Sequence, residues 1–274
     1  SKEKYYCSIM PLMSSSLHKI STKKKLDIDS VKKYIIQILT GLKLLHDNDI
    51  IHGDIKPENF LCDTGKKINF DIEQIIKYRK NKSKMNKLVN LHDEENNEEY
   101  NNIKIVKLTD MGECILPSDK TRKDEVQTRY YQSPEILLGI GFDKSCDMWA
   151  LGCSIYELIS GELLFNADDC DSDNEDIHYL YLFTQKLGMF PLDMIKKCKY
   201  KNYFTDDYKQ IKGYPNKHDD CFWQDLQNIA KLSNMSKTSE VHFISLMYAL
   251  LNYDTDKRLT STGALSHPFL CVNN

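Results

Sequence analysis

The sequence predicts a mainly α-helical fold with a small β component. Two helices, over residues 29–47 and 145–160, and one short strand, over residues 103–108, support this prediction. The strand alternates apolar and polar residues, and the second helix is largely apolar. In the first helix, apolar residues recur at the spacing of a single buried face, at Val31, Ile35, Ile38, Leu42 and Leu45. Asp29 or Ser30 is the expected N-cap of that helix.

The size and composition of the chain fit an ordinary globular protein. Its 274 residues suffice for one large domain or two small ones, and 41% of them are hydrophobic. With 37 Lys and Arg against 40 Asp and Glu, the overall charge points neither to nucleic acid nor to an anionic membrane. The nine cysteines form no C-x-x-C pair, which favours a reducing compartment. No membrane span or signal peptide is recognisable, so we expect an intracellular monomer, cytoplasmic or nuclear.

A polar stretch after the first helix carries groups suited to chemistry on a phosphate. Within His52-Gly53-Asp54-Ile55-Lys56-Pro57-Glu58-Asn59, it offers a carboxylate at Asp54, a cation at Lys56 and an amide at Asn59. The carboxylate can accept a proton from a hydroxyl, the lysine can neutralise charge on the transferred group, and the amide oxygen can bind Mg²⁺. The alternative is a polar turn without chemistry.

This stretch resembles the catalytic loop of eukaryotic protein kinases, H-R-D-L-x-x-x-N, with Gly53 where the family usually has Arg. Asp110-Met111-Gly112 follows the predicted strand and resembles the kinase D-F-G motif, and Ser133-Pro134-Glu135 resembles A-P-E. The order and spacing of the three motifs imply a protein-kinase-like fold. The resemblance makes Asp54 and Lys56 catalytic residues. It also implies that Asn59 and Asp110 bind Mg²⁺ and, with Lys56, contact ATP.

The start of the chain resembles the end of a kinase N-lobe. Residues 5–10 are expected to form its last strand, followed by the hinge and a short helix over 14–20. In that reading Met10 is the gatekeeper, and main-chain groups of Pro11 and Met13 bind the adenine edge of ATP. An ordinary strand, turn and helix is the alternative.

Three features of the kinase N-lobe are absent upstream of Asp54. The sequence has no G-x-G-x-x-G there, no lysine in a V-A-I-K-like strand and no helix with a partner glutamate. We therefore expect residues 1–13 to be the last N-lobe strand and hinge, and 14–270 to be the kinase C-lobe, with most of the N-lobe missing. The piece by itself is expected to be inactive.

Two stretches are expected to be inserts. Residues 64–102 are rich in Lys, Glu, Asp and Asn, so we expect an exposed, largely disordered insert there. Residues 188–238 correspond to the extra insert of a wider kinase group. A third stretch, residues 168–176, is an acidic run that can steer basic peptides or can be a solvated loop.

The segment from Thr128 to Gly139 resembles the group of cyclin-dependent, mitogen-activated, dual-specificity tyrosine-regulated and SR-protein kinases. Thr128 then matches the catalytic threonine that bridges the Asp and Lys of Ser/Thr kinases, whereas Gln132 replaces the usual Arg. Glu125 stands where related kinases carry an activating tyrosine. Glu125 is already negative, and Gly53 has no side chain that could hold a phosphate. The two residues together predict a kinase that is active without phosphorylation of this loop. The position of the first insert, the Met111 variant and the acidic run make SR-protein kinases the most similar members.

Two long-range contacts follow from the same resemblance. Asp147 is expected to accept hydrogen bonds from the catalytic-loop backbone, and Arg258 is expected to pair with Glu135. Together these features predict a Ser/Thr protein kinase that uses ATP and Mg²⁺ on protein substrates, with Arg/Ser-rich proteins as a further expectation. The alternative is a pseudokinase, or a lone C-lobe, that serves as a protein-binding scaffold.

Overall fold

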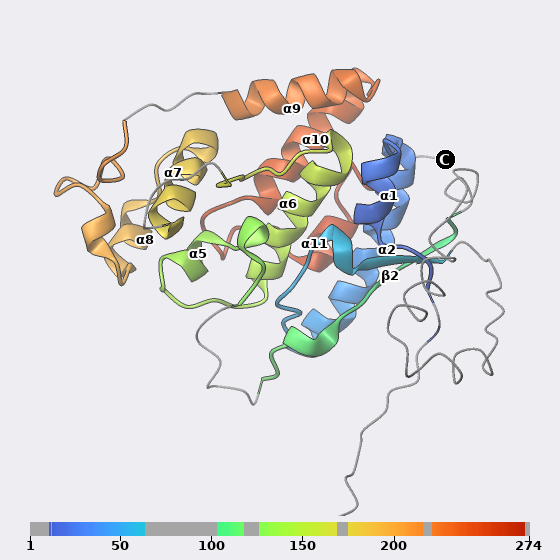
Figure 1. The fold of residues 1–274 in the computed structure, drawn as a ribbon, viewed down its shortest axis with the longest axis horizontal. Coiled ribbons are helices and arrows are strands. Elements are labelled where there is room, and N and C mark those ends of the chain that lie inside the picture. Colours follow the sequence, from blue (N-terminus) through green and yellow to red (C-terminus); the bar gives the residue numbers. More distant parts are fainter. Residues whose placement is uncertain are drawn as a thin grey trace, which may run out of the picture.

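The computed structural model describes residue 11 and residues 13–63, 103–117, 126–168, 175–215 and 221–271. Within these ranges the fold is mainly helical with one two-stranded sheet, which confirms the predicted fold class (Figure 1). None of the helices in these ranges combines the length and the apolar character that a membrane span needs. The helices and strands are α1 (Leu17–Lys23), α2 (Ile28–Asp47), η1 (Pro57–Asn59), β1 (Phe60–Asp63), β2 (Ile105–Leu108), η3 (Met111–Glu113), η4 (Arg129–Tyr131), α5 (Pro134–Leu137), α6 (Ser145–Ser160), α7 (Glu175–Leu187), α8 (Leu192–Lys197), η5 (Lys201–Tyr203), α9 (Cys221–Leu232), α10 (Lys237–Leu250) and α11 (Ser261–Leu265).

Helix α6 forms the centre of the core, as its apolar sequence predicts. Every residue from Cys146 to Ile159 is buried, and α6 packs against α1, α2 and α10 (Figure 1). Trp149 stacks on Phe165 at 5.8 Å between ring centroids and meets Phe183 edge-on at 5.2 Å. Because α6 is packed on several sides, the residues at its ends are held in fixed positions.

Helix α2 supports the segment that follows it. Four of the five predicted apolar positions are fully buried, and Leu45 is partly buried. The helix begins earlier than predicted, because Asp27 and not Asp29 or Ser30 is the N-cap. The Asp27 carboxylate accepts hydrogen bonds from the amide of Ser30 at 2.9 Å and from its hydroxyl at 2.6 Å.

The small sheet aligns two segments that lie far apart in the sequence. β1 and β2 are antiparallel, with Phe60 opposite Leu108 and Cys62 opposite Val106. β2 begins at Ile105, two residues later than predicted. Beyond its end, Thr109 donates a hydrogen bond from its amide to the carbonyl of Asn59 at 3.0 Å. The sheet therefore brings Asn59 beside the residue that precedes Asp110.

The predicted inserts have different outcomes. Residues 64–102 and the predicted strand at 5–10 lie outside the described residues. The described parts of 188–238 include α8, η5 and α9, and α9 packs on α10, where the ring of Phe222 meets that of Tyr248. Phe222, Leu226 and Ala230 of α9 are buried. This second segment thus contributes to the core. The first short helix spans Leu17–Lys23, later than the predicted 14–20, because Ser16 caps it.

Candidate active site

The backbone of the catalytic loop is held by one buried carboxylate. Asp147, in the first turn of α6, accepts hydrogen bonds from the amides of His52 at 2.8 Å and Gly53 at 2.9 Å. Its Oδ2 also lies 2.9 Å from Nε2 of the buried His46. The role predicted for Asp147 is confirmed, and through it the most deeply buried helix fixes the shape of the loop.

Gly53 adopts a backbone conformation that explains the absence of Arg. Its φ angle is +78°, in the region that favours glycine. A Cβ atom placed here would lie 2.9 Å from the carbonyl oxygen of Glu113, which is closer than real contacts allow. This form of the loop therefore excludes a side chain at position 53.

His52 ties the loop to the segment that carries Asp110. Its Nδ1 accepts a hydrogen bond from the amide of Asp54 at 3.2 Å, so the proton of the neutral ring is on Nε2. Nε2 lies 3.0 Å from the carbonyl oxygen of Thr109 and donates to it. His52 is fully buried, which fits the structural role expected for it.

Four of the predicted site residues form one hydrogen-bonded cluster. Lys56 Nζ lies 2.8 Å from Asp54 Oδ2 and donates to Thr128 Oγ1 at 2.7 Å. Thr128 Oγ1 donates in turn to Asp54 Oδ1 at 2.7 Å, which closes a triangle. Asn59 Nδ2 donates to Asp54 Oδ2 at 2.9 Å and to the Asp54 carbonyl at 2.8 Å. Thr128, 74 residues beyond Asp54, is thus placed as the sequence predicts.

These contacts set the charge of Asp54. Burial raises the pKa of its carboxyl, but the hydrogen bonds from Lys56 and Thr128, with the charge of Lys56, lower it further than burial raises it. The pKa of Asp54 therefore lies below its ordinary value of 3.8, and the side chain is an anion at neutral pH.

Asn59 and Asp110 provide oxygen atoms suited to Mg²⁺. The Asn59 side chain makes both of its hydrogen bonds to Asp54 through Nδ2, which leaves Oδ1 for a cation. Asp110 is exposed, has a φ of +64° and accepts from the amide of Gly112 at 3.4 Å. No group of three or more His, Cys, Asp or Glu that could hold a metal occurs in the described part of the chain. The donor set of one amide and one carboxylate fits Mg²⁺, which keeps water and phosphate oxygens as further ligands.

The predicted adenine-binding residues are only partly described. Met10 lies outside the described residues, Pro11 is exposed and Met13 is half-buried. Immediately after them, the Ser14 amide donates to the Cys62 carbonyl at 2.7 Å, so this segment runs beside β1. Their contacts with ATP remain predictions.

Two glutamines that sequence analysis did not assign hold the segment around Thr128. Gln127 Nε2 donates to the Cys146 carbonyl at 2.8 Å, and its Oε1 accepts from the Ser133 amide at 2.9 Å. Gln132 Nε2 donates to the Val126 carbonyl at 3.0 Å. No local pattern reveals these contacts, because each partner is a backbone group brought close by folding.

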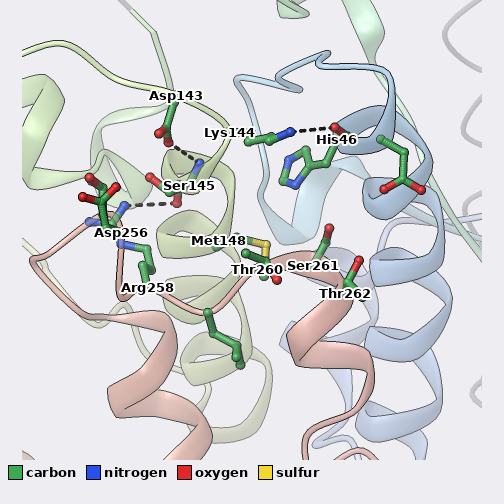
Figure 2. Close-up of a pocket in the computed structure, with 13 residues that line it drawn as sticks. His46, Asp143, Lys144, Ser145, Met148, Asp256, Arg258, Thr260, Ser261 and Thr262 are labelled. Carbon is green, nitrogen blue, oxygen red and sulfur yellow. Dashed lines mark hydrogen bonds between the residues drawn. The ribbon is translucent and has the colours of Figure 1, made fainter.

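The predicted partner of Glu135 is confirmed. Arg258 donates to Glu135 at 2.7 and 2.9 Å, and both side chains are buried. Its Nη1 also donates to the Ser145 carbonyl at 3.0 Å, as Figure 2 shows. The same picture shows Lys144 bonded to the carbonyl of His46. These bonds fix the start of α6, two residues before Asp147.

A cavity of about 380 Å³ opens between these residues, where the end of α2 and the start of α6 face the start of α11 (Figure 2). Its lining includes His46, Ser145, Met148 and Thr260 but none of the residues predicted to bind ATP or Mg²⁺. It is therefore distinct from the candidate nucleotide site.

A smaller cavity of about 240 Å³ lies beside the catalytic loop and contains a second group missed by sequence analysis. There the buried Glu157 accepts a hydrogen bond from the Tyr131 hydroxyl at 2.6 Å and lies 3.1 Å from His18 Nδ1. Glu58, in the catalytic loop, lies 3.9 Å from the same nitrogen. His18 and Glu157 are 139 residues apart, so no sequence spacing links them.

The described ends of the acidic run are engaged with the segment after Thr128. The Tyr130 hydroxyl donates to Asp168 at 2.7 Å. Arg129 forms an ion pair with Asp176, and its Nε lies 3.5 Å from Glu175. The residues between, 169–174, lie outside the described residues. The ends of the run thus have structural partners.

Comparison with known proteins agrees with this geometry. The family model for the protein kinase domain matches residues 1–270. Over 97% of its length, the chain is 28% identical to the serine/threonine-protein kinase AFC2 of Arabidopsis thaliana and 28% identical to the serine/threonine-protein kinase SRPK of Physarum polycephalum. It is also 28% identical, over 88% of its length, to the dual specificity protein kinase CLK2 of Homo sapiens. These relatives confirm the predicted resemblance to the group that includes SR-protein kinases.

The matches cover only part of each relative, but they begin at the start of this chain. The alignments cover 59% of AFC2, 67% of SRPK and 43% of CLK2, so the chain spans about half to two thirds of these relatives. These matches therefore show the family of the chain and not the activity, substrates or partners of the whole protein. The family model matches from residue 1, which gives no support to the expectation that most of an N-lobe is missing.

Proposed function

We propose that this chain, which belongs to the protein kinase family, transfers the γ-phosphoryl group of ATP to serine and threonine hydroxyls of proteins. The observation that carries the proposal is the closed triangle of Asp54, Lys56 and Thr128. It holds a carboxylate next to a cation, so that Asp54 can accept the proton of a substrate hydroxyl while Lys56 stabilises charge on the transferred group.

In the proposed reaction Asp54 orients the substrate hydroxyl. A carboxylate offers about four lone-pair sites. Thr128, Lys56 and Asn59 take three of these sites, which leaves one for the incoming hydroxyl. Asp54 receives the hydroxyl proton as the hydroxyl oxygen bonds to phosphorus and the ADP oxygen leaves.

The negative charge of the transferred group would be neutralised by Lys56 and by a Mg²⁺ ion bound to Asn59 and Asp110. Lys56 lies beside Asp54 and would donate to an oxygen of the phosphoryl group, whose oxygens share the negative charge in the transition state. When bound, ATP supplies the phosphoryl group and Mg²⁺ neutralises part of its charge. Asn59 and Asp110 would hold that ion, because both residues lie at the same end of the sheet.

The test is phosphate transfer from radiolabelled ATP to a protein substrate by the full-length protein. Asp54→Asn should lower kcat by about 10²–10⁴-fold, since it removes the proton acceptor. Asp110→Ala should abolish the Mg²⁺-dependent rate, whereas the exposed Asp256→Asn should leave it unchanged. Binding of peptide without any Asp54-dependent transfer would instead support the scaffold alternative.

We also propose that the substrates are basic, in line with the Arg/Ser-rich proteins expected from the sequence. The support is the cavity beside the catalytic loop, where Glu58 and Glu157 approach a single histidine. Burial raises the pKa of Glu157 above 4.5, although hydrogen bonds from Tyr131 and His18 lower it. Burial thus disfavours the charged form of Glu157. A guanidinium group placed against this carboxylate would stabilise the charged form through an ion pair and hydrogen bonds.

A peptide panel tests this preference. Peptides that pair serine with arginine should have a lower KM than matched acidic peptides, and added salt should reduce the difference. Glu157→Gln and Glu58→Gln should raise the KM of arginine peptides by about tenfold or more while kcat changes little. Glu162→Gln, an exposed carboxylate two residues beyond α6, is the matched control. Equal KM values for basic and acidic peptides would exclude this substrate class without affecting the assignment of Asp54.

A further inference from the structure

One end of the molecule carries a concentration of exposed lysines. α8 and the segment after it hold a set that we name the lysine surface, consisting of Lys196, Lys197, Lys199, Lys201, Lys209 and Lys212, all of them exposed. Figure 1 shows α8, in yellow to orange, at one edge of the fold. The chain as a whole has a net charge of −3, so the positive charge here is local.

Backbone contacts hold the parts of the lysine surface together. Phe204 and Ile211 form an antiparallel bridge, and the Lys212 amide donates to the Tyr203 carbonyl at 2.8 Å. Lys212 therefore lies beside the residues that follow Lys201. The Lys199 amide donates to the Leu138 carbonyl at 3.1 Å, which docks the surface onto the end of α5. The arrangement is thus set by the fold.

Most charges of the lysine surface are not compensated within the described residues. Among the residues that the structure describes, only Lys209 has a carboxylate within 4.0 Å, that of Asp207. Asp207 also accepts hydrogen bonds from the Thr205 hydroxyl at 2.7 Å and the Lys209 amide at 3.2 Å. Like charges gathered in this way repel one another, and a polyanion would relieve the repulsion.

An exposed aromatic ring lies among these lysines. Tyr200 is 41% exposed and stacks on Tyr203, with ring centroids 5.3 Å apart and an angle of 22° between the planes. A tyrosine backed by a second ring presents a fixed flat face. Single-stranded nucleic acid binds to surfaces of this kind. The bases stack on exposed aromatic rings, and nearby lysines contact the phosphates.

We propose that the lysine surface binds single-stranded nucleic acid, an activity separate from phosphate transfer. An acidic peptide would use the lysines but would gain little from the ring of Tyr200, so the combination favours bases over carboxylates. The contact would place nucleic acid next to α5, through the bond between Lys199 and Leu138. The proposal does not depend on the kinase activity.

The experiment is fluorescence anisotropy of a labelled uridine oligonucleotide of about 20 nucleotides with the full-length protein. If about three phosphates are contacted, affinity should fall roughly 20-fold between about 50 and about 200 mM salt. Replacing Lys197, Lys201 and Lys212 together by Gln should weaken binding by about tenfold or more and lower the salt slope by about 2. Tyr200→Ala should weaken binding, and Tyr200→Phe should restore it.

A second triple variant controls for net charge. Lys33→Gln, Lys104→Gln and Lys231→Gln remove three exposed lysines elsewhere, and binding should stay unchanged. Thermal unfolding checks that each variant is folded. Three results would overturn the proposal: no salt-dependent binding, equal loss in the two triple variants, or poly-glutamate binding as tightly as the oligonucleotide with no effect of Tyr200→Ala.

Discussion

Arg258 and Glu135, 123 residues apart in the sequence, form a two-bonded ion pair that is closed to solvent. Arg258 also donates from Nε to the Asn252 carbonyl at 2.8 Å and lies over the ring of Trp149, 5.2 Å from its centroid. The pair joins the segment after Thr128 to the end of the chain. Because all three nitrogens of this guanidinium donate to an acceptor, its loss should affect both the stability of the fold and the position of the segment after Thr128.

Removing one member of this pair should be costly. Glu135→Gln leaves the buried Arg258 without its counter-charge, which typically costs about 3–5 kcal/mol in the free energy of unfolding. Arg258→Lys should also destabilise, because one ammonium group cannot reach Glu135, Asn252 and Ser145 together. Urea unfolding measures the effect. The adjacent exposed pair of Lys257 and Asp254 is the control, and Lys257→Ala should change little. An equal effect at both sites would contradict this account.

Gly53→Ala should destabilise the catalytic loop. The substitution forces a side chain into a left-handed conformation, at a cost of about 1–3 kcal/mol, and brings Cβ against the Glu113 carbonyl. Both the midpoint of urea unfolding and kcat should fall. Gly41→Ala is the matched control, since its Cβ would make only an ordinary contact with Leu108 at 3.7 Å and would favour the helix. Full activity in Gly53→Ala would show that the loop tolerates another shape.

The contribution of Asp54 to stability should vanish in acid. Its pKa is depressed in the folded protein, so its interactions with Lys56 and Thr128 contribute fully above the ordinary value of 3.8. The contribution is lost as the pH falls from 3.8 through the lower folded pKa. The difference in unfolding free energy between the wild type and Asp54→Asn should therefore be constant above this range and shrink within it. Asp193→Asn, which removes an exposed carboxylate of α8, should show no such change. A difference that grows in acid would contradict the prediction.

Activity should not require phosphorylation of the segment before Thr128. Gly53 offers no cation for a phosphate, and Gln132 already ties this segment to Val126 and accepts from Arg129 at 3.0 Å. Phosphatase treatment should leave kcat unchanged. Gln132→Ala should lower it, because buried backbone groups lose partners at a cost of about 1–3 kcal/mol. Loss of activity on dephosphorylation would overturn the prediction.

The sequence by itself determined the local features of this protein. The buried face of α2 follows from the spacing of its apolar residues, and the burial of α6 follows from its largely apolar sequence. The start of α6 at Ser145 and its end near Ser160 were also predicted. The positions of Asp54, Lys56 and Asn59 within one loop, and their match to Asp110 and Thr128, also required only sequence. Such features are encoded in spacings of a few residues or in motifs of fixed order.

Only the tertiary structure decided how distant residues meet. It showed that Glu113 excludes a side chain at Gly53, that His18 lies between Glu58 and Glu157, and that two glutamines hold the segment around Thr128. It also placed the N-cap of α2 at Asp27 and brought Lys212 beside Tyr203. The physical reason is that these contacts depend on the packing of whole elements around α6. The pairing of Arg258 with Glu135 was predicted only because both residues match motifs of a known family. A contact outside such motifs, like that of His18 with Glu157, has no periodicity in the sequence from which it could be predicted.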